Sequence, residues 1–283
     1  MQDALVSMVY RQLKRWINSR SRLLSVIFQP LLWLIFLGVG FGKIFDPSNL
    51  DSSNLGVNAT AIPAVKEIVS NYFSAIFGGL DYVTFLISGM IAMTAFMGSF
   101  ISGISVIWDK QFGFLKETLV APAPRSAIII GRIVGDSLIT TIQSLIIVLL
   151  AFVFTGNINI LGIPLAMMYI FMMSIGLTSI GTVISLKFQS VEGFQILVNI
   201  IIMPFMFASG VFYPVNFMPE WMKLFSTINP LTYAVHGTRY WLTKANVGLD
   251  YLNPMIDATV LLVTAVVSMW VAKITFERTT IED

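Results

Sequence analysis

The segment 109–126 combines charged and apolar side chains in a pattern that suits docking to another protein rather than catalysis. Its centre reads Phe112-Gly113-Phe114-Leu115-Lys116-Glu117-Thr118-Leu119-Val120-Ala121-Pro122. This run can form a short amphipathic helix, which the prolines at positions 122 and 124 would end. An apolar ridge flanked by charges fits a groove on a soluble partner, so we predict a docking helix here. The alternative is a helix that lies on the membrane surface without a partner.

One pair of opposite charges, Arg132 and Asp136, lies at the start of a long apolar run. The two residues are four positions apart, so a helix places them on the same face, where they can form an ion pair. We predict this pair near the inner membrane surface, where Arg132 can reach the lipid headgroups. The middle of every predicted span is free of charge, which disfavours a carrier driven by protons or sodium ions.

Residue combinations that would support catalysis or cofactor binding are missing from the sequence. No G-x-x-x-x-G-K-[ST] motif is present, and Ile44 follows the only Gly-Lys pair, Gly42-Lys43. The chain has one histidine, His236, and no cysteine, which excludes a histidine cluster and a thiolate site for a metal. We therefore predict no catalytic, cofactor-binding or metal-binding residue, and we expect the energy for any transport to come from another protein.

The composition indicates the elements that must position these residues. Of the 283 residues, 56% are hydrophobic and only 11% are charged, against roughly 25% charged in an ordinary soluble domain. The mean hydropathy is +0.82. The net charge of +2 does not indicate a nucleic-acid partner. A helix needs about 20 apolar residues to cross a membrane, so the length allows six spans with loops left over.

The uncharged runs predict an all-α integral membrane protein with six transmembrane helices in a single domain, 1–283. The predicted order is an interfacial amphipathic helix (1–22), span one (23–45), an outer loop (46–80), span two (81–108), the cytoplasmic coupling-helix loop (109–126), span three (127–155), span four (160–186), span five (194–213), an outer re-entrant segment (214–253), span six (254–276) and a cytoplasmic tail (277–283).

The basic residues predict the orientation of the chain. With the N-terminus inside, twelve of the 17 lysines and arginines lie in inside segments and five lie in outside segments. Cytoplasmic loops carry the excess of Lys and Arg, so we predict that both termini are cytoplasmic. Residues 1–22 have a basic face that suits anionic lipid headgroups, which predicts membrane lipids as partners.

Two motifs resemble one family. The run Phe112 to Pro122 is similar to the coupling-helix signature of the ATP-binding-cassette type-2 exporter permeases. Asn229-Pro230-Leu231-Thr232-Tyr233 resembles the outer motif of the same family. The six-span layout, the amphipathic N-terminal helix and the long segment between spans five and six also match. The sequence looks closest to drug-resistance permeases of the daunorubicin-exporter kind, although exporters of polysaccharides and lipid-linked glycans share this architecture.

The resemblance implies a working unit of two membrane subunits and two ATPase subunits, with ATP and magnesium bound by the separate ATPase chain. It implies an exporter subunit in the plasma (inner) membrane that moves an amphipathic, drug-like, lipid-like or glycan substrate. The implied ATPase-coupling residues are Phe112, Gly113, Phe114, Leu115, Lys116, Glu117 and Leu119. The implied outer re-entrant motif comprises Asn229, Pro230, Leu231 and Tyr233.

Two other hypotheses remain open at this point. The first is an ion-coupled secondary transporter or a channel that works without an ATPase, which polar residues such as Gln143, Ser174 and Asn199 could serve. The second is a membrane scaffold that moves nothing. An adjacent gene for a P-loop protein without membrane spans would favour the exporter hypothesis over both.

Overall fold

A computed structural model describes residues 2–45, 62–120, 122–156, 158–249 and 252–279, and every regular element in these ranges is helical. The α-helices are α1 (Gln2–Ile17), α2 (Arg20–Trp33), α3 (Gly40–Phe45), α5 (Ile62–Ile76), α6 (Tyr82–Ile101), α7 (Ile104–Gln111), α8 (Phe114–Val120), α9 (Arg125–Phe154), α10 (Ile163–Leu186), α11 (Val191–Phe207), α12 (Glu220–Ile228), α13 (Pro230–Thr243) and α14 (Pro254–Arg278). A π-helical stretch, Leu34–Val39, joins α2 to α3, and single 3₁₀ turns occur at Ile160–Gly162 and Val215–Phe217.

Four stretches in the described residues are long and apolar enough to cross a membrane: Tyr82–Gln111, Arg125–Phe154, Ile160–Leu186 and Pro254–Arg278. They coincide with the predicted spans two, three, four and six. The predicted first and fifth spans correspond to the shorter apolar helices Phe28–Gly42 and Val191–Phe207. The 17 residues of α11 extend about 26 Å, slightly less than the roughly 30 Å of a hydrocarbon core. The count of six spans therefore stays a prediction.

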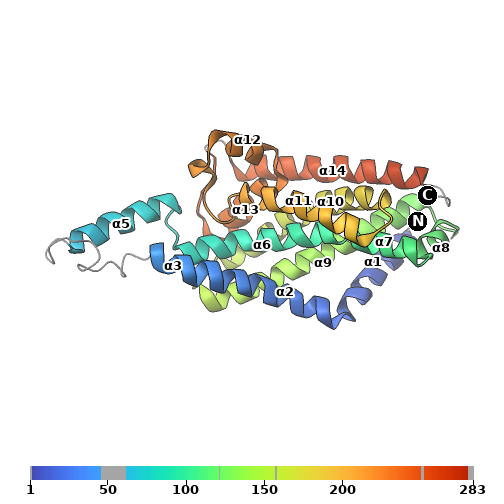
Figure 1. The fold of residues 1–283 in the computed structure, drawn as a ribbon, viewed down its shortest axis with the longest axis horizontal. Coiled ribbons are helices and arrows are strands. Elements are labelled where there is room, and N and C mark those ends of the chain that lie inside the picture. The colour runs from blue at the N-terminus through green and yellow to red at the C-terminus, as the bar shows by residue number, and fades with distance from the viewer. Residues whose placement is uncertain (1, 46–61, 121, 157, 250–251, 280–283) are drawn as a thin grey trace.

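The long helices form one elongated bundle (Figure 1). The N- and C-termini lie at the same end of the bundle, together with α1, α7 and α8, whereas α3 lies at the opposite end and α5 extends beyond it. The most extensive helix contacts join α10 to α14, α1 to α9, and α9 to both α6 and α10. Segments far apart in the sequence thus meet at the end that holds α7 and α8.

One segment differs from the sequence-based expectation, and a second shows a detail that the sequence did not predict. Part of the predicted polar loop 46–80 is helical, because α5 covers Ile62–Ile76 with a proline in its first turn and apolar residues at helical spacing. The rest of that loop up to residue 61 lies outside the described residues. The predicted second span corresponds to Tyr82–Gln111, in which a short helical turn at Ser102 and Gly103 separates α6 from α7.

Helix α1 lies directly against α9 at two glycines. A Cβ atom on Gly131 would lie 2.8 Å from the carbonyl oxygen of Leu5, and a Cβ atom on Gly135 would lie 3.0 Å from the Cβ of Gln12. Both approaches are closer than ordinary van der Waals contact, so only glycine lets the two helices pack this tightly. The side of α1 that faces the bundle carries Met8, Gln12 and Trp16.

Replacing Gly131 by valine should therefore detach α1 from the bundle. The new side chain meets backbone atoms of α1, which cannot rotate away, and overpacking of this kind costs about 1–3 kcal/mol. Trypsin should then cut after Lys14 or Arg15 much faster than in the parent protein, as mass spectrometry of the digest would show. Gly40→Val is the matched control, because a Cβ atom on Gly40 meets nothing within 4 Å. Equal cleavage of the two variants would contradict the close packing of α1.

Candidate functional site

The turn between α7 and α8 presents one aromatic side chain to the solvent. Phe112 caps the C-terminal end of α7, where its amide donates to the carbonyl oxygen of Trp108 over 2.9 Å. Gly113 follows with φ +79°, a left-handed conformation that glycine adopts without strain, and it turns the chain into α8. The side chain of Phe112 is 82% exposed as a result. This exposure fits the prediction that the loop docks onto something outside the chain.

The side chains of α8 divide between the bundle and the solvent. Leu115 is buried in a cluster that includes Met8 and Ile128, and the guanidinium of Arg11 lies 3.7 Å from the ring centre of Phe114. Glu117 is exposed. Phe114 and Leu115 thus hold α8 in place, whereas Phe112 and Glu117 face outward. The side chains of Lys116 and Leu119 lie outside the described part of the structure.

A buried carboxylate, Asp109, binds three guanidinium groups behind the turn. Arg132 Nη1 lies 2.7 Å from Asp109 Oδ2, and Nη atoms of Arg11 and Arg15 lie 3.3 Å and 3.4 Å from Oδ1. The second outer nitrogen of Arg132 donates to Ser105 Oγ over 2.7 Å. Burial lowers the pKa of Arg11, and Asp109 offsets part of that effect. This Asp109 cluster joins α1, α7 and α9 by charge-assisted bonds.

Arg132, which was predicted to pair with Asp136, belongs to the Asp109 cluster. Both outer nitrogens of Arg132 are engaged with Asp109 and Ser105, while Asp136 lies one helical turn further along α9 and is also buried. The pairing of Arg132 with Asp136 stays a prediction. Asp109 is the partner that helix spacing could not identify, because it lies on a different helix.

Backbone carbonyls of neighbouring segments tie the loop to the rest of the bundle. Lys110 Nζ donates to the carbonyl oxygen of Leu186 over 3.2 Å, and Gln111 Nε2 donates to that of Gln189 over 2.9 Å. Together with the Asp109 cluster, these bonds connect the turn at Gly113 to α1, α9 and α10. A force on the exposed turn would therefore reach several long helices at once.

The predicted outer motif starts helix α13. Asn229 is fully buried and caps this helix, because its Oδ1 accepts from the amide of Leu231 over 3.0 Å. Its Nδ2 donates to the carbonyl oxygen of Phe205 over 2.7 Å. Pro230 occupies the first helical turn, and Tyr233 Oη donates to the carbonyl oxygen of Thr227 over 2.7 Å. The motif thus connects the end of α11 with α12 and α13, away from the Asp109 cluster.

Two buried polar groups in α13 were not predicted as functional. Arg239 is 1% exposed and donates to Ser88 Oγ and to the carbonyl oxygens of Phe85 and Gly210 over 3.0 to 3.1 Å. His236 Nδ1 lies 2.5 Å from Asp257 Oδ2, on α14. In the sequence, Arg239 and His236 are recognisable only as a basic and an imidazole side chain among apolar residues. That placement does not reveal their partners.

In the described residues these features define a helical membrane protein in which ion pairs and hydrogen bonds connect the turn between α7 and α8 to the long helices. Residues 3–243 match the family described as ABC-2 type transporter. The chain therefore belongs to the ABC-2 type transporter family, and its sequence similarity extends to named permeases. It is 31% identical over 79% of its length to the putative transport permease ycf38 of Pyropia yezoensis, covering 68% of that protein.

Two bacterial relatives are similar over much of the chain. The probable multidrug ABC transporter permease YbhR of Escherichia coli (strain K12) is 27% identical over 69% of this chain and 57% of that protein. The probable doxorubicin resistance ABC transporter permease protein DrrC of Mycobacterium tuberculosis (strain CDC 1551 / Oshkosh) is 27% identical over 72% of this chain and 74% of that protein. The relatives are transport permeases rather than enzymes, which agrees with the prediction of a transport subunit.

Proposed function

We propose that this chain is the membrane subunit of an ATP-driven exporter and that a separate ATPase moves it through the turn between α7 and α8. Its cargo would be an amphipathic molecule of drug-like, lipid-like or glycan type. The chain itself would bind no nucleotide, and ATP and magnesium would be held by the partner. The family assignment supports the transport role, and the exposed Phe112 beside the buried Asp109 cluster supports the coupling role.

The proposed arrangement in the membrane has both termini in the cytoplasm. The placement of the two termini at the same end of the bundle as α8 supports this orientation (Figure 1). In this arrangement α2 and α11 complete six spans, while α12 and α13 dip into the outer leaflet as re-entrant helices. Two copies of the chain would line the path between them, and the chain would work in the plasma membrane.

The coupling step follows from the contacts of the loop. Closure of two ATPase subunits on ATP would displace the turn that carries Phe112 and Glu117. The Asp109 cluster and the bonds of Lys110 and Gln111 would pass this displacement to α1, α9 and α10. The two membrane subunits would then tilt and open outward, and hydrolysis would reset them.

The test is the double variant Phe112→Ala/Glu117→Gln, assayed with the ATPase that co-purifies with the chain. Both side chains face the solvent, so the fold should be unaffected. Loss of an aromatic anchor at an interface costs 2 kcal/mol or more, so we expect the stimulated ATP hydrolysis to fall at least about tenfold.

The control for this experiment is Leu161→Ala, an 87% exposed apolar residue at the start of the stretch that leads into α10. This variant should keep full assembly and full stimulation. If the double variant also assembles and stimulates normally, the turn is not the coupling element. If vesicles that contain the chain alone move cargo on an ion gradient without nucleotide, the chain is a secondary transporter instead.

A further inference from the structure

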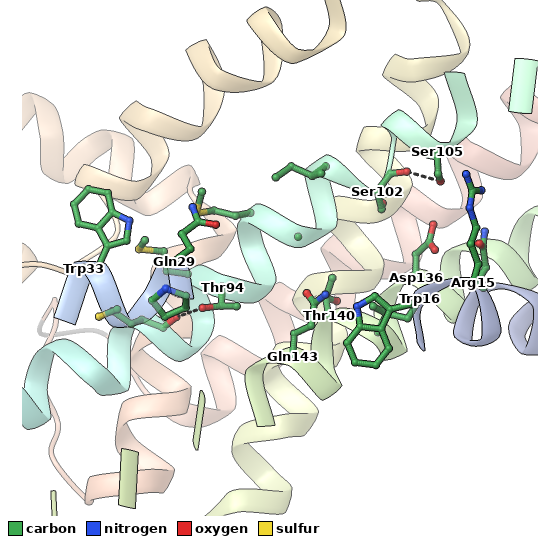
Figure 2. Close-up of a pocket in the computed structure, with 18 residues that line it drawn as sticks. Arg15, Trp16, Gln29, Trp33, Thr94, Ser102, Ser105, Asp136, Thr140 and Gln143 are labelled. Carbon is green, nitrogen blue, oxygen red and sulfur yellow. Dashed lines mark hydrogen bonds between the residues drawn. The ribbon is translucent and has the colours of Figure 1, made fainter. Parts of the chain in front are cut away.

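A cavity of about 180 Å³ lies between α1, α2, α6 and α9 (Figure 2). In the view of Figure 2, Trp33 lies at one end of this cavity, Arg15 and Asp136 lie at the other, and Thr94 and Gln143 lie between them. An engineered apolar cavity of about 150 Å³ in another protein holds benzene, so this cavity has room for about one or two aromatic rings. Neither the family assignment nor the turn between α7 and α8 accounts for it.

The side-chain amide of Gln143 is the polar group that this cavity makes available at membrane depth. Gln143 lies in the middle third of α9, within the stretch Arg125–Phe154 that is long and apolar enough to cross a membrane. Its side chain lines the cavity and is partly exposed there. The amide forms no hydrogen bond with any described residue, and it is not sealed inside the protein, so a molecule in the cavity can reach it. Hydrocarbon offers no hydrogen-bond partner, so an unpaired amide at this depth is costly.

The hydroxyl groups beside Gln143 add acceptors to this polar middle. Thr94 Oγ1 donates to the carbonyl oxygen of Met90, and Thr140 Oγ1 donates to that of Ser137, both over 2.9 Å. Each hydroxyl oxygen can therefore still accept, whereas the amide of Gln143 can both donate and accept. A ligand hydroxyl, which also donates and accepts, matches this set of groups better than a group that only accepts.

The walls on either side of the polar middle suit an aromatic ring. Met90, Met93 and Met97 of α6 line the cavity with thioether side chains, which adapt to irregular shapes and contact aromatic rings favourably. Trp33 of α2 contributes an indole ring, and its contact with Phe212, with ring centres 5.6 Å apart, fixes the orientation of that ring. A flat apolar body between these side chains would place its hydroxyl near Gln143.

The charges at the cavity wall favour an uncharged occupant. Among the described residues, the charged side chains that line the cavity are Arg15 and Asp136, and their charges cancel. The guanidinium of Arg15 is also bound to Asp109 over 3.4 Å. An ion taken out of water pays a large desolvation cost unless an opposite charge compensates it. The lining offers no surplus of either sign, so a charged molecule would not recover that cost.

We propose that this cavity binds an uncharged aromatic alcohol of one or two rings, whose hydroxyl exchanges hydrogen bonds with the amide of Gln143 and whose ring lies against the methionines and Trp33. The inference narrows the cargo of the proposed exporter to one chemical class, and the role as a cargo site rests on that proposed function. Binding itself requires neither ATP nor a partner chain.

The test is photolabelling of the full chain in phosphatidylcholine nanodiscs. The probe is benzyl alcohol with a trifluoromethyl-diazirine in the para position, and the corresponding benzylamine and benzoic acid supply a cation and an anion of the same shape. Peptide mass spectrometry measures the labelling of α6 residues 90–97, divided by that of α14 residues 262–271, whose side chains Val263, Val266 and Trp270 are exposed. This ratio corrects for different partitioning of the three probes into the membrane.

We expect labelling of residues 90–97 by the alcohol to saturate and to fall when unlabelled benzyl alcohol is added. The labelling ratio should be about tenfold higher for the alcohol than for either charged probe, because the cavity does not compensate an ion. Labelling that does not saturate and is not displaced would show that the cavity holds only water or lipid, and it would overturn the proposal. Equal ratios for the three probes would overturn it as well.

Gln143→Met tests the hydrogen bonds of the hydroxyl. The variant removes the amide and keeps an unbranched side chain of the same length, so it should lower the saturable labelling by the alcohol about tenfold. Gln195→Met is the matched control, because Gln195 is exposed on α11 and does not line the cavity. Gel filtration of both variants checks that the fold is retained. Unchanged labelling in Gln143→Met would overturn the proposal.

The labelling experiment is independent of the test of the export function. It contains no ATPase, so a negative result would remove the binding site and leave the exporter hypothesis intact. Conversely, saturable labelling together with normal ATPase stimulation in the Phe112/Glu117 double variant would leave the binding site intact and remove the coupling role of the turn.

Discussion

Asp109→Ala should both destabilise the protein and uncouple it from the ATPase proposed as its partner. The substitution leaves the guanidinium groups of Arg11, Arg15 and Arg132 close together without the carboxylate that they share. Breaking a buried ion pair by removing one partner typically costs about 3–5 kcal/mol. We expect the detergent-solubilised variant to unfold at a temperature lower by about 10 °C and to stimulate ATP hydrolysis at least about tenfold less.

A second substitution shows whether charge imbalance is the cause. The double variant Asp109→Asn/Arg132→Gln removes one charge of each sign, so it should recover part of the lost thermal stability. Glu220→Gln is the surface control, because Glu220 is 88% exposed in its pair with Lys223 and exposed pairs contribute little. A parent-like unfolding temperature and full stimulation in Asp109→Ala would refute a central role for the Asp109 cluster.

Arg239→Ala should lower the thermal stability by a similar amount, at a distance from the turn between α7 and α8. The guanidinium is fully buried and bonds to Ser88, Phe85 and Gly210, and its carbon lies 3.7 Å from the ring centre of Phe85. Within the described residues no ion pair includes Arg239, so backbone carbonyls and an aromatic ring stabilise its charge. Truncation leaves these acceptors unsatisfied around a cavity, which costs about 3–5 kcal/mol.

The measurement is again the unfolding temperature in detergent, together with the amount of protein that accumulates in the membrane. Arg239→Lys should be intermediate, because a single ammonium group cannot reproduce the forked geometry. Lys223→Ala, a cation in an exposed pair on α12, is the control and should unfold like the parent. If Arg239→Ala matched this control, the contacts of Arg239 would not hold α13 against α6.

Helices with a continuous apolar pattern and clear end signals could be predicted closely. The predicted span 254–276 corresponds to α14, Pro254–Arg278, because Asn253 caps the helix and Pro254 fits its first turn. The helical turn at Ser102 and Gly103 between α6 and α7 could not be predicted, because the mean hydropathy gives no signal where only the hydrogen-bonding pattern of a helix changes.

The sequence predicted where the candidate site lies in the chain but not which side chains contact one another in it. The mixture of charges and aromatic residues around Phe112 predicted a short helix there, which α8 confirms, whereas its docking role stays a prediction. The partners of Asp109 could not be found, because Arg11 and Arg15 lie 98 and 94 positions away and only tertiary packing brings them together. Helix spacing identifies only neighbours three or four residues away. It therefore predicted Asp136, and not Asp109, as the partner of Arg132.

The side chains of Lys110 and Gln111 donate to the main-chain oxygens of Leu186 and Gln189. The kind of acceptor affects which substitutions these two positions tolerate during evolution. Every amino acid supplies the same carbonyl, so substitutions at positions 186 and 189 leave the acceptors in place. Homologous proteins can therefore exchange the side chains at these two positions without losing the acceptors of Lys110 and Gln111.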